Sequence, residues 1–294
     1  MSEKIRILII GATGKIGQQL LTILKNEKYA TLCDPFGTYF SNKNGDLEFL
    51  DLRDYDTIEK TFEKIKPNVV VNTAALTYPP SCEKNKTLAW KMNTHSVELM
   101  VQLCRNINCK MVFISSDQVY SSKNSPIGET DPLNPLNYYA KTKLEAENFV
   151  LKLNDYLIIR TAWVNDVETN TMSFISQVLN SLEKNQNFDA PSDYFGHPTY
   201  STNVAEIIIE LIFKQISGIF NVTGLTYTDR FSFAKKIAKI FRFNPNLINE
   251  ISLNNSEIVR PQKINLNLEK IKSKIDTKLL TLDEQLQLMH GKYD

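Results

Sequence analysis

The sequence predicts an α/β protein built on a doubly wound parallel sheet, and three observations predict it. Short apolar runs that fit buried strands alternate with longer runs of helical periodicity through the first half of the chain. A glycine-rich turn follows the first of these apolar runs. The chain has 294 residues, 42% of them hydrophobic and 23% charged, which suffices for one large α/β unit with a smaller second region.

The first half of the chain supplies four buried strands. They are expected at Ile5–Ile10, Val69–Asn72, Lys110–Ser115 and Tyr156–Arg160, where the sequence is almost continuously apolar. Runs of this kind fit strands that are covered on both faces. Strand–helix alternation then implies a parallel sheet with helices on both sides. The helices expected between the strands are Ile16–Asn26, Thr57–Lys66, Thr87–Asn106 and Tyr139–Leu153.

The pattern changes after residue 163. We expect a smaller C-terminal substrate-binding region that is interleaved with the last sheet elements, formed by residues 164–196 and 224–294, with sheet elements returning around 197–223. The individual elements expected here are a polar helical stretch at Asn165–Asp193, helices at Asn203–Lys214, Phe231–Phe241 and Leu282–Met289, and a strand at Gly218–Val222.

The charge of the chain excludes a dedicated nucleic-acid binder. Lysines and arginines number 34 against 33 aspartates and glutamates, the formal net charge is +1, and no basic stripe is present. No apolar run approaches the ~20 residues that cross a bilayer. The N-terminus enters a short strand at once, without a secretory leader, so a cytoplasmic protein with no membrane partner is expected.

The cysteines and histidines predict no metal site. Cys33, Cys82, Cys104 and Cys109 form no Cys-x-x-Cys pair and have no regular spacing. Buried free thiols in a reducing compartment are therefore expected rather than disulfides. None of the three histidines stands near a cysteine pair, so a structural zinc ion is not expected.

The turn after the first strand has the composition of a phosphate-binding loop. Gly11-Ala12-Thr13-Gly14-Lys15-Ile16-Gly17 ends the strand and opens the first helix. Glycines let the backbone approach a pyrophosphate, and a helix N-terminus offers free N–H groups and a partial positive charge to that anion. The alternative is a glycine-rich turn without a ligand. Because strand and helix flank the turn, residues 1–163 are predicted to form a Rossmann-type dinucleotide-binding domain.

Two placements of the second strand predict opposite cofactor preferences. If the strand is Ala30–Cys33, Asp34 stands where a carboxylate would accept a hydrogen bond from the ribose 2′-hydroxyl of NAD. If the strand ends at 37–40, Ser41, Asn42 and Lys43 stand there and could bind the 2′-phosphate of NADP. The residues alone leave both placements open.

A serine and a Tyr-x-x-x-Lys motif supply acid–base chemistry. Ser116 follows the end of an expected strand, at the edge where α/β sheets bind ligands. Tyr139 and Lys143 are four residues apart on an expected helix, so the phenol and the ammonium share one face. A neighbouring cation stabilises phenolate, so the pKa of Tyr139 is expected to fall. The second match to the motif, Tyr39 and Lys43, has no helix to lie on.

The order of these motifs resembles that of an extended short-chain dehydrogenase/reductase and, within that superfamily, the sugar-nucleotide-binding dTDP-4-dehydrorhamnose reductase group. The Arg-Thr-x-Trp, Gly-x-Pro-Thr and Arg-Pro pieces point to this group. In family order, the matching pieces are Gly11–Gly17, Asp51-Leu52, Asn72-Thr73-Ala74-Ala75, Asn93, Ser115-Ser116-Asp117, Tyr139…Lys143, Arg160-Thr161-Ala162-Trp163, Asp193…Gly196-His197-Pro198-Thr199 and Arg260-Pro261.

The resemblance implies roles for the matching residues. Ser116, Tyr139 and Lys143 would form the catalytic triad, with Ser116 also contacting the substrate and the other two the cofactor. Asp117 and Trp163 would bind the sugar. Arg260 would face a nucleotide diphosphate, a surface salt bridge being its alternative. NADP is the expected cofactor, with NAD as the alternative, because the second strand placement is closer to this family. The remaining cofactor-binding residues would be Gly11, Thr13, Gly14, Lys15, Ile16, Gly17, Asp51, Leu52, Ala74 and Ala75.

The chain departs from the family at two places and differs from related dehydratases at a third. Tyr78-Pro79-Pro80 stands where the family has Ala-Ala-x-Thr followed by Val-Asp, so a substrate-side loop differs and the sugar stays open. Tyr194 replaces a glutamine before the Gly-x-Pro-Thr piece. Related 4,6-dehydratases carry Asp-Glu where this chain has Asp117-Gln118, and the missing acid disfavours dehydration.

The resemblance therefore implies an NAD(P)H-dependent oxidoreductase that reduces a nucleotide-linked 4-keto-6-deoxy sugar. Hydride would reach the keto carbon, and Tyr139 would donate the proton. One alternative is an epimerase that uses the same triad with tightly bound NAD. Another is a non-catalytic regulatory subunit, since the methionine adenosyltransferase beta subunit resembles the same group. The expected partners are a nucleotide-sugar substrate and a second copy of the chain in a homodimer.

Overall fold

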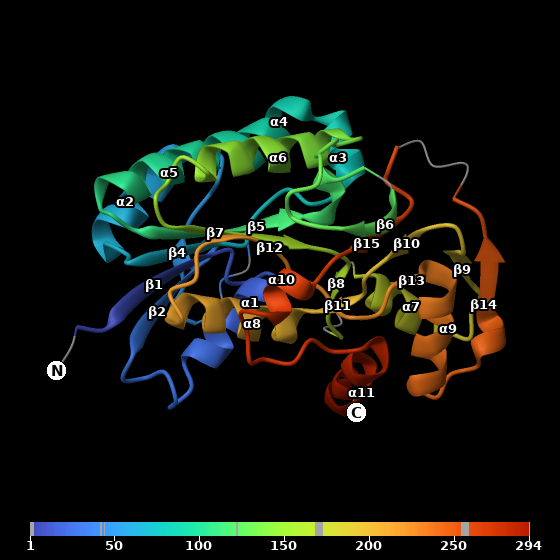
Figure 1. The fold of residues 1–294 in the computed structure, drawn as a ribbon. Helices are drawn as coiled ribbons and strands as arrows, with labels where there is room; N and C mark the ends of the chain where they lie inside the picture. The colour runs from blue at the N-terminus through green and yellow to red at the C-terminus, as the bar shows by residue number, and fades with distance from the viewer. Residues whose placement is uncertain are drawn as a thin grey trace.

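The computed structural model describes residues 3–41, 43, 45–121, 123–167, 173–253 and 259–293. A seven-stranded sheet with the order β12-β7-β5-β4-β1-β2-β3 lies at its centre, and every neighbouring pair of strands is parallel. Helices cover both faces of the sheet (Figure 1), which confirms the predicted doubly wound α/β fold. The strands are β1 (Ile5–Ile10), β2 (Cys33–Tyr39), β3 (Glu48–Phe49), β4 (Val69–Asn72), β5 (Lys110–Ser116), β7 (Tyr156–Thr161) and β12 (Gly218–Asn221).

Side chains of the central strands alternate between two hydrophobic clusters. In β1, Ile7 and Ile9 point into one cluster with α1 and α8, and Leu8 and Ile10 point into the other with α2, α5 and α6. Burial on both sides explains why β1 is apolar at every position except Arg6. The helices of the two layers are α1 (Lys15–Leu24), α8 (Ser201–Phe213) and α10 (Glu269–Lys272) on the first face, and α2 (Tyr55–Ile65), α5 (Ser96–Asn106) and α6 (Tyr138–Val150) on the second.

The helix expected at Thr87–Asn106 forms with one irregularity. The chain runs through α4 (Lys86–Trp90), a π-helical turn at Lys91–His95 and then α5, preceded by the short α3 (Pro79–Lys84). The π-helical turn places the Asn93 side chain against the loop after β4, where its Oδ1 accepts a hydrogen bond from Leu76 N at 2.8 Å. Wide turns of this kind often occur beside functional sites.

The structure decides between the two placements of the second strand. Ala30 lies in a turn, and β2 begins at Cys33 and ends at Tyr39, although Pro35 and Gly37 disfavour a strand. Gly37 is needed there because a Cβ would lie 2.8 Å from the Ala12 Cβ, which cannot rotate away, and 2.6 Å from Leu47 Cδ2. Asp34 is therefore at the start of β2, so its proposed contact with the cofactor ribose is wrong.

The C-terminal region predicted to bind substrate, called the substrate-binding region below, has its own hydrophobic cluster, to the right in Figure 1. Of the helical stretch expected at 165–193, only α7 (Phe174–Glu183) is helical among the described residues, and β9 (Phe188–Pro191) follows it. The cluster is completed by α9 (Arg230–Ile240), β14 (Ile248–Ile251), which pairs with β9, and α11 (Leu282–Tyr293). The other short elements are β6 (Lys123–Ile127), β8 (Val164–Asn165), β10 (Phe195–Gly196), β11 (Thr199–Tyr200), β13 (Thr228–Asp229), β15 (Ile264–Leu266) and 3-10 turns at Asp117–Val119 and Pro245–Leu247.

One segment assigned to the substrate-binding region by the sequence lies elsewhere. β15 pairs with β6, and Leu266, Leu268 and Ile271 belong to the same hydrophobic cluster as β1 and α8. The four cysteines are buried free thiols, as expected. Within the described ranges, we find no helix that combines the length and hydropathy needed to span a membrane.

A buried ion pair joins α6 to the sheet. Arg160 of β7 donates to Glu147 of α6 through Nη2 at 2.7 Å and Nε at 3.1 Å, and the two side chains are 2% and 1% exposed. Arg160 Nη1 also donates to the Tyr120 hydroxyl at 2.7 Å. Because this geometry satisfies both charges, the helix that carries Tyr139 and Lys143 is fixed against β7.

Candidate active site

A cavity of about 660 Å³ opens at the carboxyl edge of the sheet. It lies beside β1, where the chain winds to β2 on one side and to β4 on the other. Its walls come from the segments that follow β1, β4, β5 and β7, from α6 and from the substrate-binding region. Open α/β sheets bind ligands at such a switch point.

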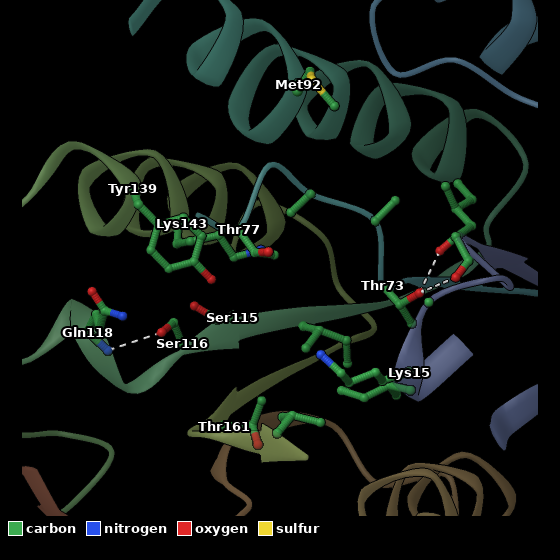
Figure 2. A pocket seen from close by; sticks show the side chains of 18 of the residues that line it. Lys15, Thr73, Thr77, Met92, Ser115, Ser116, Gln118, Tyr139, Lys143 and Thr161 are labelled. Carbon is green, nitrogen blue, oxygen red and sulfur yellow. Dashed lines mark hydrogen bonds between the residues drawn. The ribbon is translucent and has the colours of Figure 1, made fainter. Parts of the chain in front are cut away.

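The glycine turn forms one end of the cavity. Gly11 has φ +81°, and a Cβ there would lie 2.9 Å from the Ala74 Cβ. Thr73 Oγ1 holds the turn by donating to Ile10 O at 2.9 Å and to Gly11 O at 3.0 Å (Figure 2). Gly17 does not line the cavity, since a Cβ there would lie 2.3 Å from Gly11 O: it allows the helix to pack against the turn. The predicted residues of the turn that do line it are Gly11, Thr13, Gly14, Lys15 and Ile16.

The first turn of α1 fits an anion. No side chain caps the helix at Gly14, and no acidic residue occurs in its first turn. The N–H groups at the start of a helix and the helix dipole then favour a negatively charged group. The residues present therefore fit the pyrophosphate of a dinucleotide.

We expect Gly14→Val to raise the dissociation constant for NADPH at least about 100-fold, because the side chain would occupy the space a pyrophosphate needs. A Cβ at Gly14 would lie 3.3 Å from Gly11 O, so the fold can adjust, and the midpoint of thermal unfolding should change little. Fluorescence titration measures the affinity. Gly291→Val is the matched control, as nothing lies within 4 Å of a Cβ there. NADPH affinity within threefold of the original protein would mean that the turn does not bind the cofactor.

The middle of the cavity carries the other predicted cofactor residues, Asp51, Leu52, Ala74 and Ala75. Asp51 forms a two-pronged ion pair with Arg53, whose Nη2 lies 2.7 Å from Oδ2 and whose Nε lies 2.9 Å from Oδ1. This hydrogen bonding lowers the pKa of Asp51. Arg53 also lies over the Phe40 ring, with Cζ 4.6 Å from the ring centroid. Phe40 lines the cavity just after β2.

The catalytic candidates meet at the far side of the cavity from the glycine turn. Figure 2 shows Tyr139 and Lys143 on one helix above the end of β5, which carries Ser115 and Ser116, with Lys15 and Thr73 opposite. α6 begins where the Asn137 side chain accepts a hydrogen bond from Ala140 N at 2.9 Å, which sets the position of the next turn. Ser116 Oγ donates to Asp117 Oδ1 at 3.1 Å and accepts from Gln118 N at 3.2 Å.

Burial controls the protonation of this group. It raises the pKa of Tyr139, a rise that a hydrogen bond with Ser116 partly opposes and the charge of Asp117 reinforces. It also lowers the pKa of Lys143 to about 7, against the attraction of Glu147. The expected fall in the pKa of Tyr139 is therefore not found, because desolvation of the buried phenol dominates. A buried phenol that stays protonated at neutral pH is suited to donate a proton.

The predicted substrate residues Asp117, Trp163 and Arg260 also line the cavity. Burial raises the pKa of Asp117 to about 6, and the Ser116 hydroxyl and the charge of Arg230 oppose that rise. Trp163 has φ +40°, an uncommon backbone conformation for a large side chain, and the Thr199 N–H donates to its carbonyl oxygen at 3.2 Å. Strain of this kind is typical of ligand sites.

Several lining residues were not predicted as site residues. Arg230 and Tyr194 stand beside Trp163, and Phe40 packs against Arg53, the ion-pair partner of Asp51. Asp229-Arg230 begins α9, and its sequence carries no motif that separates Arg230 from a surface arginine. Tyr194 stood out only as a departure from the family pattern. Asn42 lies outside the described residues.

The chain matches known proteins over most of its length. The model of the RmlD substrate binding domain matches residues 5–294. The dTDP-4-dehydrorhamnose reductase of Aggregatibacter actinomycetemcomitans is 28% identical over 90% of this chain and 92% of its own. The methionine adenosyltransferase 2 subunit beta of Xenopus tropicalis is 27% identical over 80% of this chain and 72% of its own. A solved structure of a hypothetical dTDP-4-dehydrorhamnose reductase from Sulfolobus tokodaii superposes with a TM-score of 0.86 at 29% identity, covering 96% and 99% of the two chains.

These matches confirm the resemblance that the motifs predicted. The family model begins at the first residue of β1 and runs to the last residue of the chain, and so includes both the sheet and the substrate-binding region. The chain belongs to the RmlD substrate binding domain family.

Proposed function

We propose that this protein is an NAD(P)H-dependent reductase of a nucleotide-linked 4-keto-6-deoxy sugar. One observation carries the proposal: Ser116, Tyr139 and Lys143 line the same cavity as an uncapped helix N-terminus behind a glycine turn. An acid–base group and a dinucleotide cradle in one cavity suit hydride transfer to a carbonyl. The 28% identity to a dTDP-4-dehydrorhamnose reductase supports this choice of substrate class.

In the proposed reaction, each side chain of the triad has a separate role. The nicotinamide would supply the hydride. Ser116 Oγ would turn from Asp117 to donate a hydrogen bond to the carbonyl oxygen of the substrate, which polarises the carbon. Tyr139 would give its phenolic proton to the same oxygen as negative charge develops there. Lys143, one turn further along α6, would stabilise the phenolate left behind and contact the nicotinamide ribose.

NADP is the better fit to the adenosine end. β2 ends at Tyr39, and no acidic residue occurs between Tyr39 and Gly45, so nothing there would repel a 2′-phosphate. Lys43 follows the strand, and Arg53 lies over Phe40 at the cavity. Arginine and lysine side chains bind phosphate, whereas NAD-selective sites place a carboxylate at this point.

We expect Asp34→Ala to leave the ratio of kcat/KM for NADPH to that for NADH unchanged within twofold. Asp34 is five residues before the end of β2, about 16 Å along the strand, and its carboxylate is engaged with Lys4 at 3.3 Å. Arg53→Gln should lower the ratio about tenfold, the effect of losing one charged hydrogen bond. Steady-state kinetics with both cofactors measure the two ratios. A shift for the Asp34 variant and none for the Arg53 variant would contradict this assignment of the adenosine end.

Two alternatives use parts of the same site. An epimerase would need the same triad and a permanently bound NAD. A regulatory subunit would need only the cavity, and the 27% identity to a methionine adenosyltransferase subunit favours it as the second candidate. The buried, ordered Ser116–Tyr139–Lys143 group favours turnover, because a purely binding site has no need for it. A homodimer, from the resemblance, and a cytoplasmic location, from the four free cysteines, are further proposals.

The first test follows NADPH absorbance with a dTDP-4-keto-6-deoxy sugar as substrate and with NADH in parallel. The proposal expects consumption of the reduced cofactor, faster with NADPH. Interconversion of sugar isomers without net cofactor use would support the epimerase. Cofactor binding with no change in any nucleotide sugar would support the regulatory subunit and overturn the reductase.

A further inference from the structure

The substrate end of the cavity contains two guanidinium groups. Arg230, the first residue of α9, and Arg260 both line the cavity, together with Tyr194 and Asp117. Burial and then the like charge of Arg260 lower the pKa of Arg230 to about 10, against the opposing effects of Tyr194 and Asp117. Tyr194 lies near both guanidinium groups, whose charges oppose the rise that burial causes in its pKa. Two like charges thus converge beside one tyrosine.

Arg230 covers the indole that was predicted to contact the sugar. Its Cζ lies 3.6 Å from the centroid of a Trp163 ring and 4.3 Å from that of the Phe174 ring. Gly196 also packs directly against the indole, since a Cβ there would lie 2.6 Å from Trp163 Cε2. With one face of Trp163 occupied, the cavity presents hydrogen-bond donors at this point in place of an aromatic surface.

Both guanidinium groups have a donor without an acceptor. Arg230 Nη1 and Arg260 Nε are shielded from solvent and have no hydrogen-bond partner among the described residues. No ion pair within 4.0 Å joins either arginine to a described carboxylate, and Asp117 already accepts from Ser116. A buried hydrogen-bond donor without an acceptor, or a buried charge without a counter-charge, lowers the stability of the protein. A bound ligand commonly supplies the missing acceptor.

We propose that Arg230 acts with Arg260 to bind an anionic oxygen group of the substrate. This inference rests on the proposed function, in which a nucleotide-linked sugar occupies the cavity. A planar guanidinium suits phosphate and carboxylate oxygens equally well. The group is then either the diphosphate of the nucleotide or a carboxylate on the sugar. The second outcome would revise the proposed sugar, because a 6-deoxy sugar carries a methyl group where a glucuronate carries its carboxylate. Of the two arginines, Arg230 is the one whose charge acts on Asp117, the residue that accepts the hydrogen bond from Ser116.

Calorimetric titration of the NADP⁺-saturated protein tests the inference. The probes are dTDP and UDP, which carry only the diphosphate, and UDP-glucose and UDP-glucuronate, which differ by a carboxylate. The variants are Arg230→Gln, Arg230→Lys and Arg260→Gln. Arg105→Gln is the matched control, since Arg105 is an exposed arginine of α5 whose Nη2 donates to Lys152 O at 3.2 Å.

If the pair binds the diphosphate, Arg230→Gln and Arg260→Gln should each weaken dTDP or UDP binding roughly 10- to 100-fold. If it binds a sugar carboxylate, Arg230→Gln should leave dTDP and UDP unchanged and abolish a preference for UDP-glucuronate over UDP-glucose. In either case Arg230→Lys should lose less affinity than Arg230→Gln, because lysine keeps the positive charge although it lacks the planar guanidinium that donates two hydrogen bonds.

Affinity for NADP⁺ reports whether the variants are folded, and it should stay unchanged in all of them. If the original protein binds these probes and Arg230→Gln changes none of their affinities, the inference alone is overturned. If the original protein binds none of the four, the proposed function fails and the inference fails with it.

Discussion

Tyr139→Phe is expected to lower kcat by roughly 10²- to 10⁴-fold, the usual contribution of a positioned proton donor. The substitution removes one hydroxyl from a buried ring that lines the cavity and leaves the rest of the side chain in place. Cofactor affinity should stay within a few-fold, because the glycine turn and the α1 N-terminus are unaltered. Stopped-flow or steady-state measurement of NADPH consumption gives kcat, and fluorescence titration gives the NADPH dissociation constant.

The adjacent residue offers a matched control. Tyr138→Phe makes the same chemical change one position earlier on α6, where the ring packs near Trp90, with centroids 6.3 Å apart. That variant should keep more than half of the original kcat. A Tyr139 variant that retains more than one-tenth of kcat would show that another group supplies the proton.

Glu147→Ala is expected to lower the free energy of unfolding by roughly 3–5 kcal/mol, because it leaves the Arg160 charge buried without its partner. Arg160 is 2% exposed and has two of its nitrogens bonded to this carboxylate, so water cannot replace Glu147 without disturbing the core. The same loss removes the attraction that opposes the fall in the pKa of Lys143. Unfolding by urea, followed by circular dichroism, measures the change in stability.

Two further variants separate the cost of an unpaired charge from the value of the pair. Glu147→Leu combined with Arg160→Met should recover much of the stability, since an apolar pair of similar volume replaces both charges. Glu48→Ala breaks the exposed ion pair with Lys64, 2.6 Å long, and should cost no more than about 1 kcal/mol. If the single and double Glu147 variants were equally destabilised, burial of an unpaired charge would not be the cause.

The sheet could be predicted because burial on two faces leaves a strong mark on the sequence. β1 and β4 have the predicted bounds, and α1 and α6 start one residue earlier than expected. β2 was harder to recognise because Pro35 and Gly37 interrupt its pattern, and the need for Gly37 arises from Ala12 and Leu47, which are distant in the sequence. Strand propensities describe only neighbouring residues in the sequence, so they cannot predict a strand that depends on contacts between distant residues.

The candidate site could be predicted as a set of residues but not in its electrostatics. The spacing of the glycines and the four-residue interval between Tyr139 and Lys143 are local features, so the sequence alone could identify these residues. The direction of the shift in the pKa of Tyr139 could not be predicted in this way, because it depends on how completely the folded protein excludes water from the phenol. Arg230 could not be identified for a similar reason: its role follows from Trp163, 67 positions earlier, which only the fold brings to 3.6 Å.

The packing of residues 264–279 against one face of the central sheet has a consequence for biosynthesis. Leu266, Leu268, Ile271 and Leu279 complete the hydrophobic cluster that begins with β1, yet they follow most of the substrate-binding region in the chain. A ribosome therefore makes the first strand long before the side chains that finish covering its face. Domains fold as units during synthesis once their chain is available. Here the central sheet must wait until the chain has been made as far as residue 279, so a nascent chain that stalls before residue 264 would expose an open core.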